Sequence, residues 1–348
     1  MEPDFDALPY LTADLPGTGE RIRARLEDFV VEEVPAYLPA GEGEHLYLWV
    51  EKKGLTTRAL VERLVALGVP EKAIGVAGLK DKYAVTRQWL SLPKRFEGVL
   101  PAFEGPEIRI LQAGLHKNKL KTGHLKGNRF AVLVEGAELA RAKSVLERLV
   151  AEGLPNYYGP QRFGLGGKNP ERGLELMRKG KGRGGPWLKR FLLGSVQSLV
   201  FNAYLAERLE RGLFVRLLPG DVAKKHDTDG EFLVEDAEAE TARARRFEIS
   251  ATGPLFGKKY FEAEGEARAL EDEILARFDL ARSQFNKRKG ARRWIRVPVG
   301  EARVEPDPRG VWLYFFLPKG SYATSLLREV MKKNPEATGP GATGEERA

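Results

Sequence analysis

The strongest constraint on how this chain can fold is a change in its residue pattern at about Gly153–Pro155. Before that point, strand-like alternation of apolar and polar residues mixes with helix-like spacing, as in residues 45–53 and 138–152. After it residues 156–173 are irregular and rich in glycine and arginine, helical and glycine-punctuated segments follow, and a long strand pattern returns only near residue 304. With 348 residues, of which 42% are apolar, the chain is long enough for two globular domains or one large one.

The residue pattern also predicts the individual elements. Thr56 and Thr57 are candidate caps for a helix that ends at Gly68, and Ser195 is the candidate cap for a second helix. Strands are expected at 22–35, 45–53, 73–79, 85–92, 115–120, 129–136 and in the stretch 304–322, and helices at 58–68, 138–152, 195–212, 263–280 and 324–333.

Composition excludes several kinds of chemistry. The chain has no cysteine, which rules out thiol catalysis, disulfides and iron–sulfur clusters. Its four histidines are not spaced as a metal site, so no metal or other cofactor is expected. The absence of a signal pattern and of a long apolar stretch predicts a soluble, cytoplasmic protein without membrane contact. A net charge of +8 permits a polyanionic partner without proving one.

Asp81 is the first candidate for chemistry. It lies in the turn Gly78-Leu79-Lys80-Asp81-Lys82, between two expected strands and between two cations. Neighbouring positive charge favours the ionised form of a carboxylate, which can then act as a nucleophile or a base. A turn of this composition is more often an ordinary solvated surface turn.

Three basic segments are candidates for nucleic-acid contact. Residues 115–129 and 282–296 contain no acid, and residues 156–164 combine arginine and glutamine with aromatic rings. The candidate RNA-contacting cations are Lys117, Lys119, Lys121, Arg162, Arg292 and Arg293. The alternatives are a lysine-protected edge strand, a packed domain junction and a solvated helix face.

Together these segments resemble a known family. AGLKDKYAVTRQW, LKGNRF, NYYGPQRFG, SVQSLVFN, ATGPLFG and LPKGSYATSLLRE occur in this order in the TruD family of tRNA pseudouridine synthases. The resemblance implies an α+β fold: a pseudouridine synthase catalytic domain with a mixed, largely antiparallel sheet and flanking helices, interrupted by a family-specific α/β insertion domain. The catalytic domain would comprise residues 1–155 and 304–334 and the insertion 156–303, with a disordered tail at 335–348.

The resemblance also implies roles for individual residues. Asp81 would be the catalytic aspartate, and the partner would be tRNA, bound by a monomer that modifies uridine 13 of the D-arm. Substrate-binding residues would be Phe29, Asn128, Tyr322, Phe130, Arg23 and Lys80. Tyr322 stands where a phenylalanine is common in the family, and Arg21 and Arg25 rival Arg23 as the basic residue before Phe29.

The reaction implied is an isomerisation that breaks the N1–C1′ bond of a uridine and joins C5 to C1′. Asp81 could attack C1′ or C6, or remove a ribose proton, and the sequence does not choose among these. Two other classes of function fit the same residues: a hydrolase that releases the free base, and a non-catalytic RNA-binding or RNA-folding module.

Overall fold

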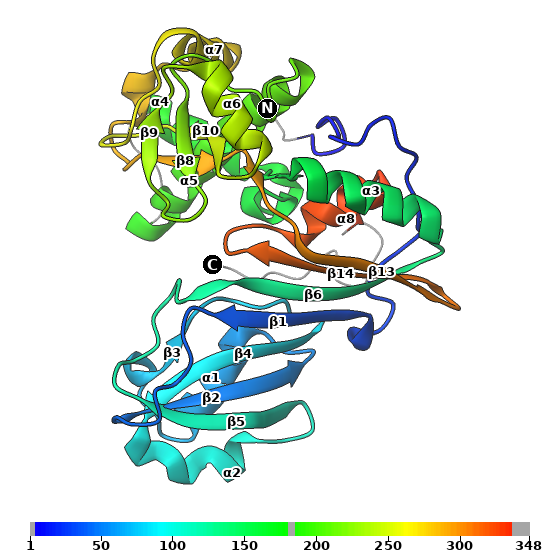
Figure 1. The fold of residues 1–348 in the computed structure, drawn as a ribbon. Coiled ribbons are helices and arrows are strands. Elements are labelled where there is room, and N and C mark those ends of the chain that lie inside the picture. The colour runs from blue at the N-terminus through cyan, green and yellow to red at the C-terminus, as the bar shows by residue number, and fades with distance from the viewer. Residues whose placement is uncertain (1–3, 180–184, 336–348) are drawn as a thin grey trace. The chain divides into compact units, whose positions relative to one another are not determined.

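The structure is a computed structural model that describes residues 4–179 and 185–335 (Figure 1). Contacts between residues divide the chain into two compact units. Unit 1 comprises the residues up to 15, residues 148–298 and residues 324–333, and unit 2 comprises residues 16–147 and 299–323. The tail expected at 335–348 lies outside the described residues except for Pro335.

Unit 2 is built on one eight-stranded sheet in the order β13-β14-β6-β1-β4-β2-β5, with β3 paired to β4. Every pairing is antiparallel except that of β1 with β4, which confirms the expected mixed, largely antiparallel sheet. The strands are β1 (Phe29–Pro35), β2 (His45–Lys53), β3 (Gly75–Val76), β4 (Val85–Pro93), β5 (Ile108–His116), β6 (Leu125–Glu135), β13 (Gly300–Asp307) and β14 (Gly310–Pro318). Figure 1 shows β6 running between β1 and β14, so strands from both ends of the chain meet there.

One face of this sheet packs against helix α1 (Thr57–Ala66) and is called the α1 face. Leu46, Leu48 and Val50 of β2 and Leu90 and Leu92 of β4 join apolar side chains of α1 in one core cluster. The helix begins where the sequence predicts, because the Thr56 side chain accepts a hydrogen bond from the Ala59 amide. Strand β2 has the predicted bounds as well.

The remaining helices of unit 2 are short apart from α3. They are α2 (Leu100–Phe103) and the 3-10 turns η1 (Leu26–Asp28), η2 (Glu71–Ala73) and η3 (Lys94–Val99). Helix α3 (Leu139–Glu152) matches the expected helix at 138–152 and passes from unit 2 into unit 1.

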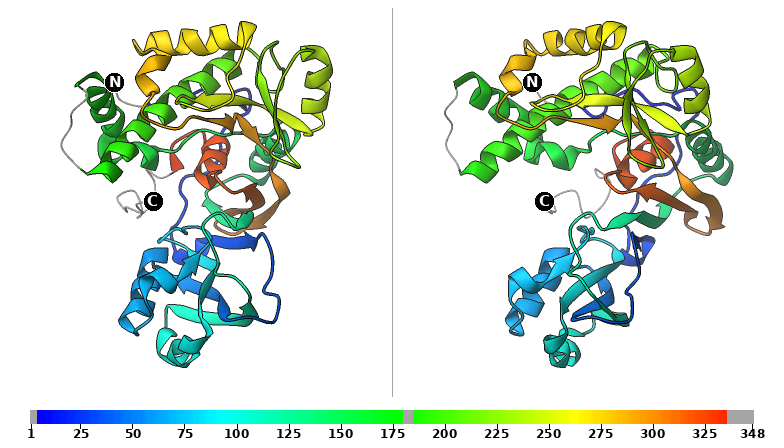
Figure 2. Two further views of the ribbon diagram at one scale, coloured as in Figure 1. Left: turned by 90° about the vertical axis from the view of Figure 1, so that its left-hand side faces the viewer. Right: turned by 60° about the vertical axis from the view of Figure 1, so that its left-hand side comes forward.

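Unit 1 contains a four-stranded antiparallel sheet in the order β11-β10-β8-β9. Its strands are β8 (Val222–Lys225), β9 (Glu231–Leu233), β10 (Ile249–Leu255) and β11 (Ala291–Trp294), and a two-stranded pair joins β7 (Leu154–Pro155) to β12 (Arg296–Val297). Its helices are α4 (Asn169–Lys179), α5 (Pro186–Glu210), α6 (Ala237–Arg245), α7 (Gly265–Arg277) and α8 (Ala323–Met331), with 3-10 turns η4 (Pro160–Phe163), η5 (Leu165–Gly167) and η6 (Arg282–Phe285) (Figure 2).

Three predictions of local structure are wrong. The strand expected at 22–35 begins only at Phe29, because residues 26–28 form the 3-10 turn η1. Ser195 does not cap a helix, because α5 begins at Pro186 after Gly185 and Ser195 lies inside it, donating its hydroxyl to the Leu192 carbonyl at 2.6 Å. Residues 115–120 do not form a strand either, because β5 ends at His116 and the chain then loops to Leu125. The lysines of this loop therefore do not alternate along one strand face.

No helix in the described part of the chain combines the length and apolar composition needed to cross a bilayer.

Candidate active site and RNA-contacting residues

The candidate active site lies on the α1 face of the unit 2 sheet. Residues paired across neighbouring strands point to the same face. Glu33 of β1 is paired with Asn128 of β6, Val31 with Phe130, and Lys52 of β2 with Thr86 of β4. Val31 is also paired with Thr86, so all these positions share the face that packs on α1. Leucine and valine occupy this face farther along β2 and β4, whereas the end that carries Lys52 and Thr86 is polar.

Asp81 lies in the turn between β3 and β4, with its side chain 38% exposed. Its carboxylate is 3.5 Å from a terminal nitrogen of Arg23. The backbone carbonyl of Asp81 accepts a hydrogen bond from the Lys52 ammonium at 2.8 Å. One cation therefore faces the side chain while a second fixes the main chain of the same residue.

Arg23 is the arginine that meets Asp81. Arg21, one of its rivals, pairs instead with Glu135 and is mostly exposed. Arg23 is only 8% exposed and has a φ of 59°, a left-handed conformation that is uncommon outside glycine. Its guanidinium lies 4.2 Å from the centre of the Phe29 ring. Strained backbone of this kind tends to occur where function requires a side chain in one particular place.

The turn rests on a second, buried layer of polar contacts. The Lys80 ammonium bonds Glu33 Oε2 at 2.7 Å, and the side chains of the pair are 3% and 0% exposed. The Lys80 amide donates to Thr57 Oγ1 at 2.9 Å, and Gln88 Nε2 donates to the Gly78 carbonyl at 3.3 Å. Lys80, which was expected to contact the substrate, is thus buried beneath the turn and holds its shape.

Phe29, Phe130 and Phe315 form a continuous group of aromatic rings within unit 2. Phe29 meets Phe130 edge-on, with ring centres 6.3 Å apart, and Phe130 stacks on Phe315 at 5.2 Å. Phe29 is 0% exposed and Phe130 7% exposed, so neither ring offers an open face. A base could stack on Phe29 only if Arg23 moved away from it.

Asn128 and Tyr322 are two further residues that were expected to bind the substrate. Asn128 is partly buried, and its Oδ1 is buried without a hydrogen-bond partner among the described residues. Arg23 Nε and Thr86 Oγ1 share that condition. Buried polar atoms normally have partners, so each of these three atoms is able to bond an added polar ligand. Tyr322 is partly buried directly before α8, in the same unit.

Two polar residues of the candidate site, Glu33 and Lys52, were not predicted from the sequence. Both lie at strand positions that share a face with apolar residues: Glu33 follows the alternation of Phe29 and Val31, and Lys52 that of Leu48 and Val50. A charge on the buried face of a strand is costly unless it is paired, and that pattern could have identified them.

The six cations expected to contact RNA lie in three places: the loop after β5, the run 282–296 and the turn η4. Lys117, Lys119 and Lys121 lie in the loop after β5, where Lys117 pairs with Glu42 at 2.8 Å and Lys119 bonds the Lys72 carbonyl at 2.6 Å. Lys121 is exposed, and so is Lys117. This loop keeps a positive surface in unit 2.

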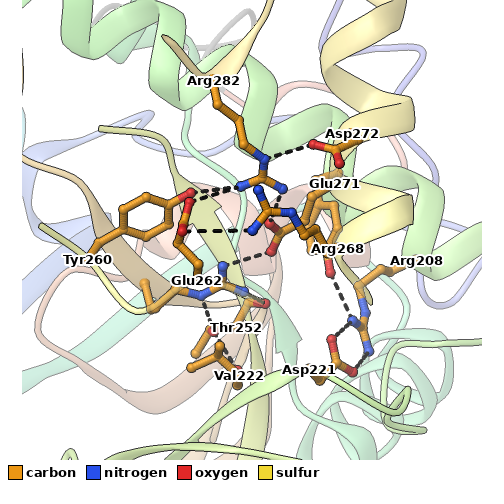
Figure 3. Close-up of polar contacts among 12 residues, drawn as sticks. Arg208, Asp221, Val222, Thr252, Tyr260, Glu262, Arg268, Glu271, Asp272 and Arg282 are labelled. Carbon is orange, nitrogen blue, oxygen red and sulfur yellow. Dashed lines mark hydrogen bonds and ion pairs between the residues drawn. The ribbon is translucent and has the colours of Figure 1, made fainter. Parts of the chain in front are cut away.

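The basic run at 282–296 does not form the exposed stripe that was expected. Arg292 has a fully buried side chain that pairs with Glu271 at 2.7 Å, so it is not a surface cation. Arg293 is partly buried and donates to Asn156 Oδ1 at 2.8 Å. Figure 3 shows the surrounding network, in which Arg282 is directed at Glu271 and Asp272.

Arg162, in η4, is partly exposed and donates its Nε to Ser198 Oγ at 3.1 Å.

Comparison with known proteins covers nearly the whole chain. The profile of the family described as tRNA pseudouridine synthase D (TruD) matches residues 7–179 and 185–330. The chain is 64% identical over 328 residues to a tRNA pseudouridine synthase D of Thermus thermophilus, covering 93% of this chain and 92% of that protein. It is 48% identical over 340 residues to a protein of that name from Anaeromyxobacter dehalogenans, covering 94% and 97%.

The fold agrees with a solved structure. The crystal structure of a putative tRNA pseudouridine synthase D from Methanosarcina mazei superimposes with a TM-score of 0.76 at 23% identity, covering 94% of this chain and 96% of that one. The expected α+β fold is thereby confirmed. The chain belongs to the TruD family of tRNA pseudouridine synthases.

Proposed function

We propose that this chain converts a uridine of tRNA to pseudouridine and that the Asp81 carboxylate is the reacting group. The observation that carries the proposal is the state of Asp81: a part-exposed carboxylate held 3.5 Å from Arg23, whose Nε is buried without a hydrogen-bond partner among the described residues. The names of the relatives favour the same reaction.

The chemistry needs no group beyond the side chains and water. The N1–C1′ bond breaks, the detached uracil turns within the site, and C5 bonds to C1′. The hydrogen on C5 leaves to solvent and N1 takes up a proton, so the product has the mass of the substrate. Asp81 would form the transient bond at C1′ or C6, or remove a ribose proton. The target base must leave its stack, at a cost of about a few kcal/mol that protein contacts offset.

We assign supporting roles to the neighbours of Asp81. Asn128 Oδ1, without a described partner, can accept a hydrogen bond from the uracil edge. Phe29, Phe130 and Tyr322 would line the base, with Arg23 moving off the Phe29 ring as the base enters. Tyr322→Phe should leave turnover unchanged if the ring only stacks, and lower it if the hydroxyl bonds the base.

We further propose uridine 13 of the D-arm as the target, and RNA contact by the loop carrying Lys117, Lys119 and Lys121. The division into a catalytic domain at 1–155 and 304–334 and an insertion at 156–303 stays a prediction. It is consistent with Asp81, Asn128 and Tyr322 all belonging to unit 2.

The decisive experiment uses tRNA carrying tritium at uridine C5. Isomerisation releases the label to water without releasing uracil, hydrolysis releases labelled uracil, and simple binding releases nothing. Asp81→Asn should bind tRNA but release no tritium, since a carboxamide is a poor nucleophile. Glu97→Gln, an exposed carboxylate in η3, is the matched control and should behave as wild type. Turnover by Asp81→Asn within tenfold of wild type would refute the assignment of Asp81.

A further inference from the structure

Two arginine side chains converge on one point of helix α5 in unit 1. A Cβ built on Gly194 would lie 3.0 Å from Arg288 Nη2 and 3.1 Å from Arg162 Nη2. Arg162 comes from η4 and Arg288 from the chain between η6 and β11. Because both distances start from one point, the two terminal nitrogens are close enough for a single anion to accept a hydrogen bond from each.

Gly194 makes this approach possible. It lies inside α5, where glycine is less favourable than alanine. Any larger residue would press against both guanidinium groups. The glycine therefore costs some helix stability and leaves room for two cations against the helix surface.

A third arginine adds to the positive charge. Arg288 Nη1 donates to the backbone carbonyl of Arg190, and the Arg190 side chain is exposed on the same helix. Burial lowers the pKa of Arg288, and the charges of Arg162 and Arg190 lower it further. No described carboxylate pairs with Arg162, Arg190 or Arg288.

The contrast with other arginines of unit 1 makes this lack of neutralisation informative. Arg208 pairs with Asp221 at 2.7 Å between fully buried side chains (Figure 3). Arg292 pairs with Glu271 at the same distance, again between fully buried side chains. Arg282 is also paired, with Glu271 and Asp272. Acids thus neutralise Arg208, Arg282 and Arg292, whereas like charges left together are destabilising until an anion binds.

We propose that Arg162, Arg190 and Arg288 form a phosphate-binding site, called the arginine site, that holds one backbone phosphate of the RNA. Guanidinium groups bind phosphate oxygens through paired N–H donors, and two of them held near one point can contact the same phosphate. This inference rests on the proposed function for the identity of the RNA, and it shifts the contact expected of the run 282–296 from Arg292 to Arg288.

The test measures the affinity for tRNA of the full chain as a function of potassium chloride concentration. Arg288→Gln should weaken binding several-fold and lower the log–log salt slope by about 0.7–0.9, the value for one lost phosphate contact. The matched control is Arg245→Gln, an exposed arginine ending α6 of the same unit, which should leave the slope unchanged. Equal slopes for Arg288→Gln and Arg245→Gln would overturn the proposal.

Two further measurements test whether the effect comes from misfolding and whether the site binds free phosphate instead of RNA. Gly194→Ala keeps every charge and should fold at least as well, yet weaken tRNA binding by displacing the two guanidinium groups; wild-type affinity would contradict the geometry. Inorganic phosphate should compete with tRNA for wild type but not for Arg288→Gln. If inorganic phosphate stabilises the wild type against heat while the affinity for tRNA is the same in both proteins, the site binds free phosphate and the RNA assignment is wrong.

These outcomes are separable from the proposed reaction. If Arg288→Gln binds tRNA weakly while wild type releases no tritium from C5-labelled tRNA, the arginine site stands and the catalytic proposal fails. If tritium is released equally by wild type and Arg288→Gln with unchanged affinities, the reverse holds.

Discussion

The Glu33–Lys80 pair under the Asp81 turn gives the sharpest quantitative prediction. Its charged atoms are 2.7 Å apart and its side chains are 0% and 3% exposed, so water cannot solvate either charge when the other is removed. Breaking a buried pair by removing one partner costs about 3–5 kcal/mol. Glu33→Gln and Lys80→Met should each lower the free energy of unfolding by about that amount.

The double variant distinguishes the energy of the interaction between Glu33 and Lys80 from the cost of removing either charge alone. Glu33→Gln keeps an Oε1 acceptor for the Trp89 amide, which now bonds Glu33 Oε1 at 3.2 Å. With both charges gone, the remaining loss is one unsatisfied amide group, about 1–3 kcal/mol. The double variant should therefore be more stable than either single variant or similar to the milder one, far from the sum of the two.

The assay is urea unfolding followed by tryptophan fluorescence, since Trp89 is buried beside the pair. Arg58→Gln serves as the control, because Arg58 pairs with Glu62 and Glu71 at the surface and its loss should leave the urea midpoint close to that of wild type. Additive losses in the double variant, or a loss below about 1 kcal/mol in Glu33→Gln, would refute the claim of a desolvated, mutually dependent pair.

Three further outcomes are expected. Asn128→Ala should reduce the rate of tritium release by about 5- to 150-fold, equivalent to about 1–3 kcal/mol for a hydrogen bond to the uracil edge; unchanged turnover would exclude that bond. Burial, followed by the charge of Arg296, lowers the pKa of His226 to about 4. Between pH 6.5 and 4 the unfolded chain therefore binds more protons than the folded one. As the pH falls through this range, the free energy of unfolding should decrease by on the order of 1–2 kcal/mol, after allowing for the partial exposure of His226. The difference in urea midpoint between wild type and His226→Gln should change on acidification, and parallel curves would contradict the argument. Thr56→Ala should cost about 0.5–2 kcal/mol through loss of the cap on α1, with a urea midpoint equal to wild type as the contrary result.

The sequence alone determined what depends on near neighbours. The alternation in 45–53 predicted β2 with its observed bounds, and Thr56 predicted the start of α1. Both signals are local, because side-chain period and cap chemistry involve residues only a few positions apart. The motif order also sufficed to identify the family and its α+β fold. Where a local signal misled, as at Ser195, an upstream Pro186 gave the helix an earlier start.

Tertiary structure alone decided which charges are buried in ion pairs and which lie beside a like charge. Arg292 and Arg288 belong to the same basic run, yet one pairs with Glu271 inside unit 1 and the other meets Arg162 at Gly194. Likewise Asp81 gains Arg23 and Lys52 as neighbours only after the strands of unit 2 are assembled. The physical reason is that the energy of a charge is set by solvent exposure and by partners brought from distant parts of the chain, which residue spacing does not encode.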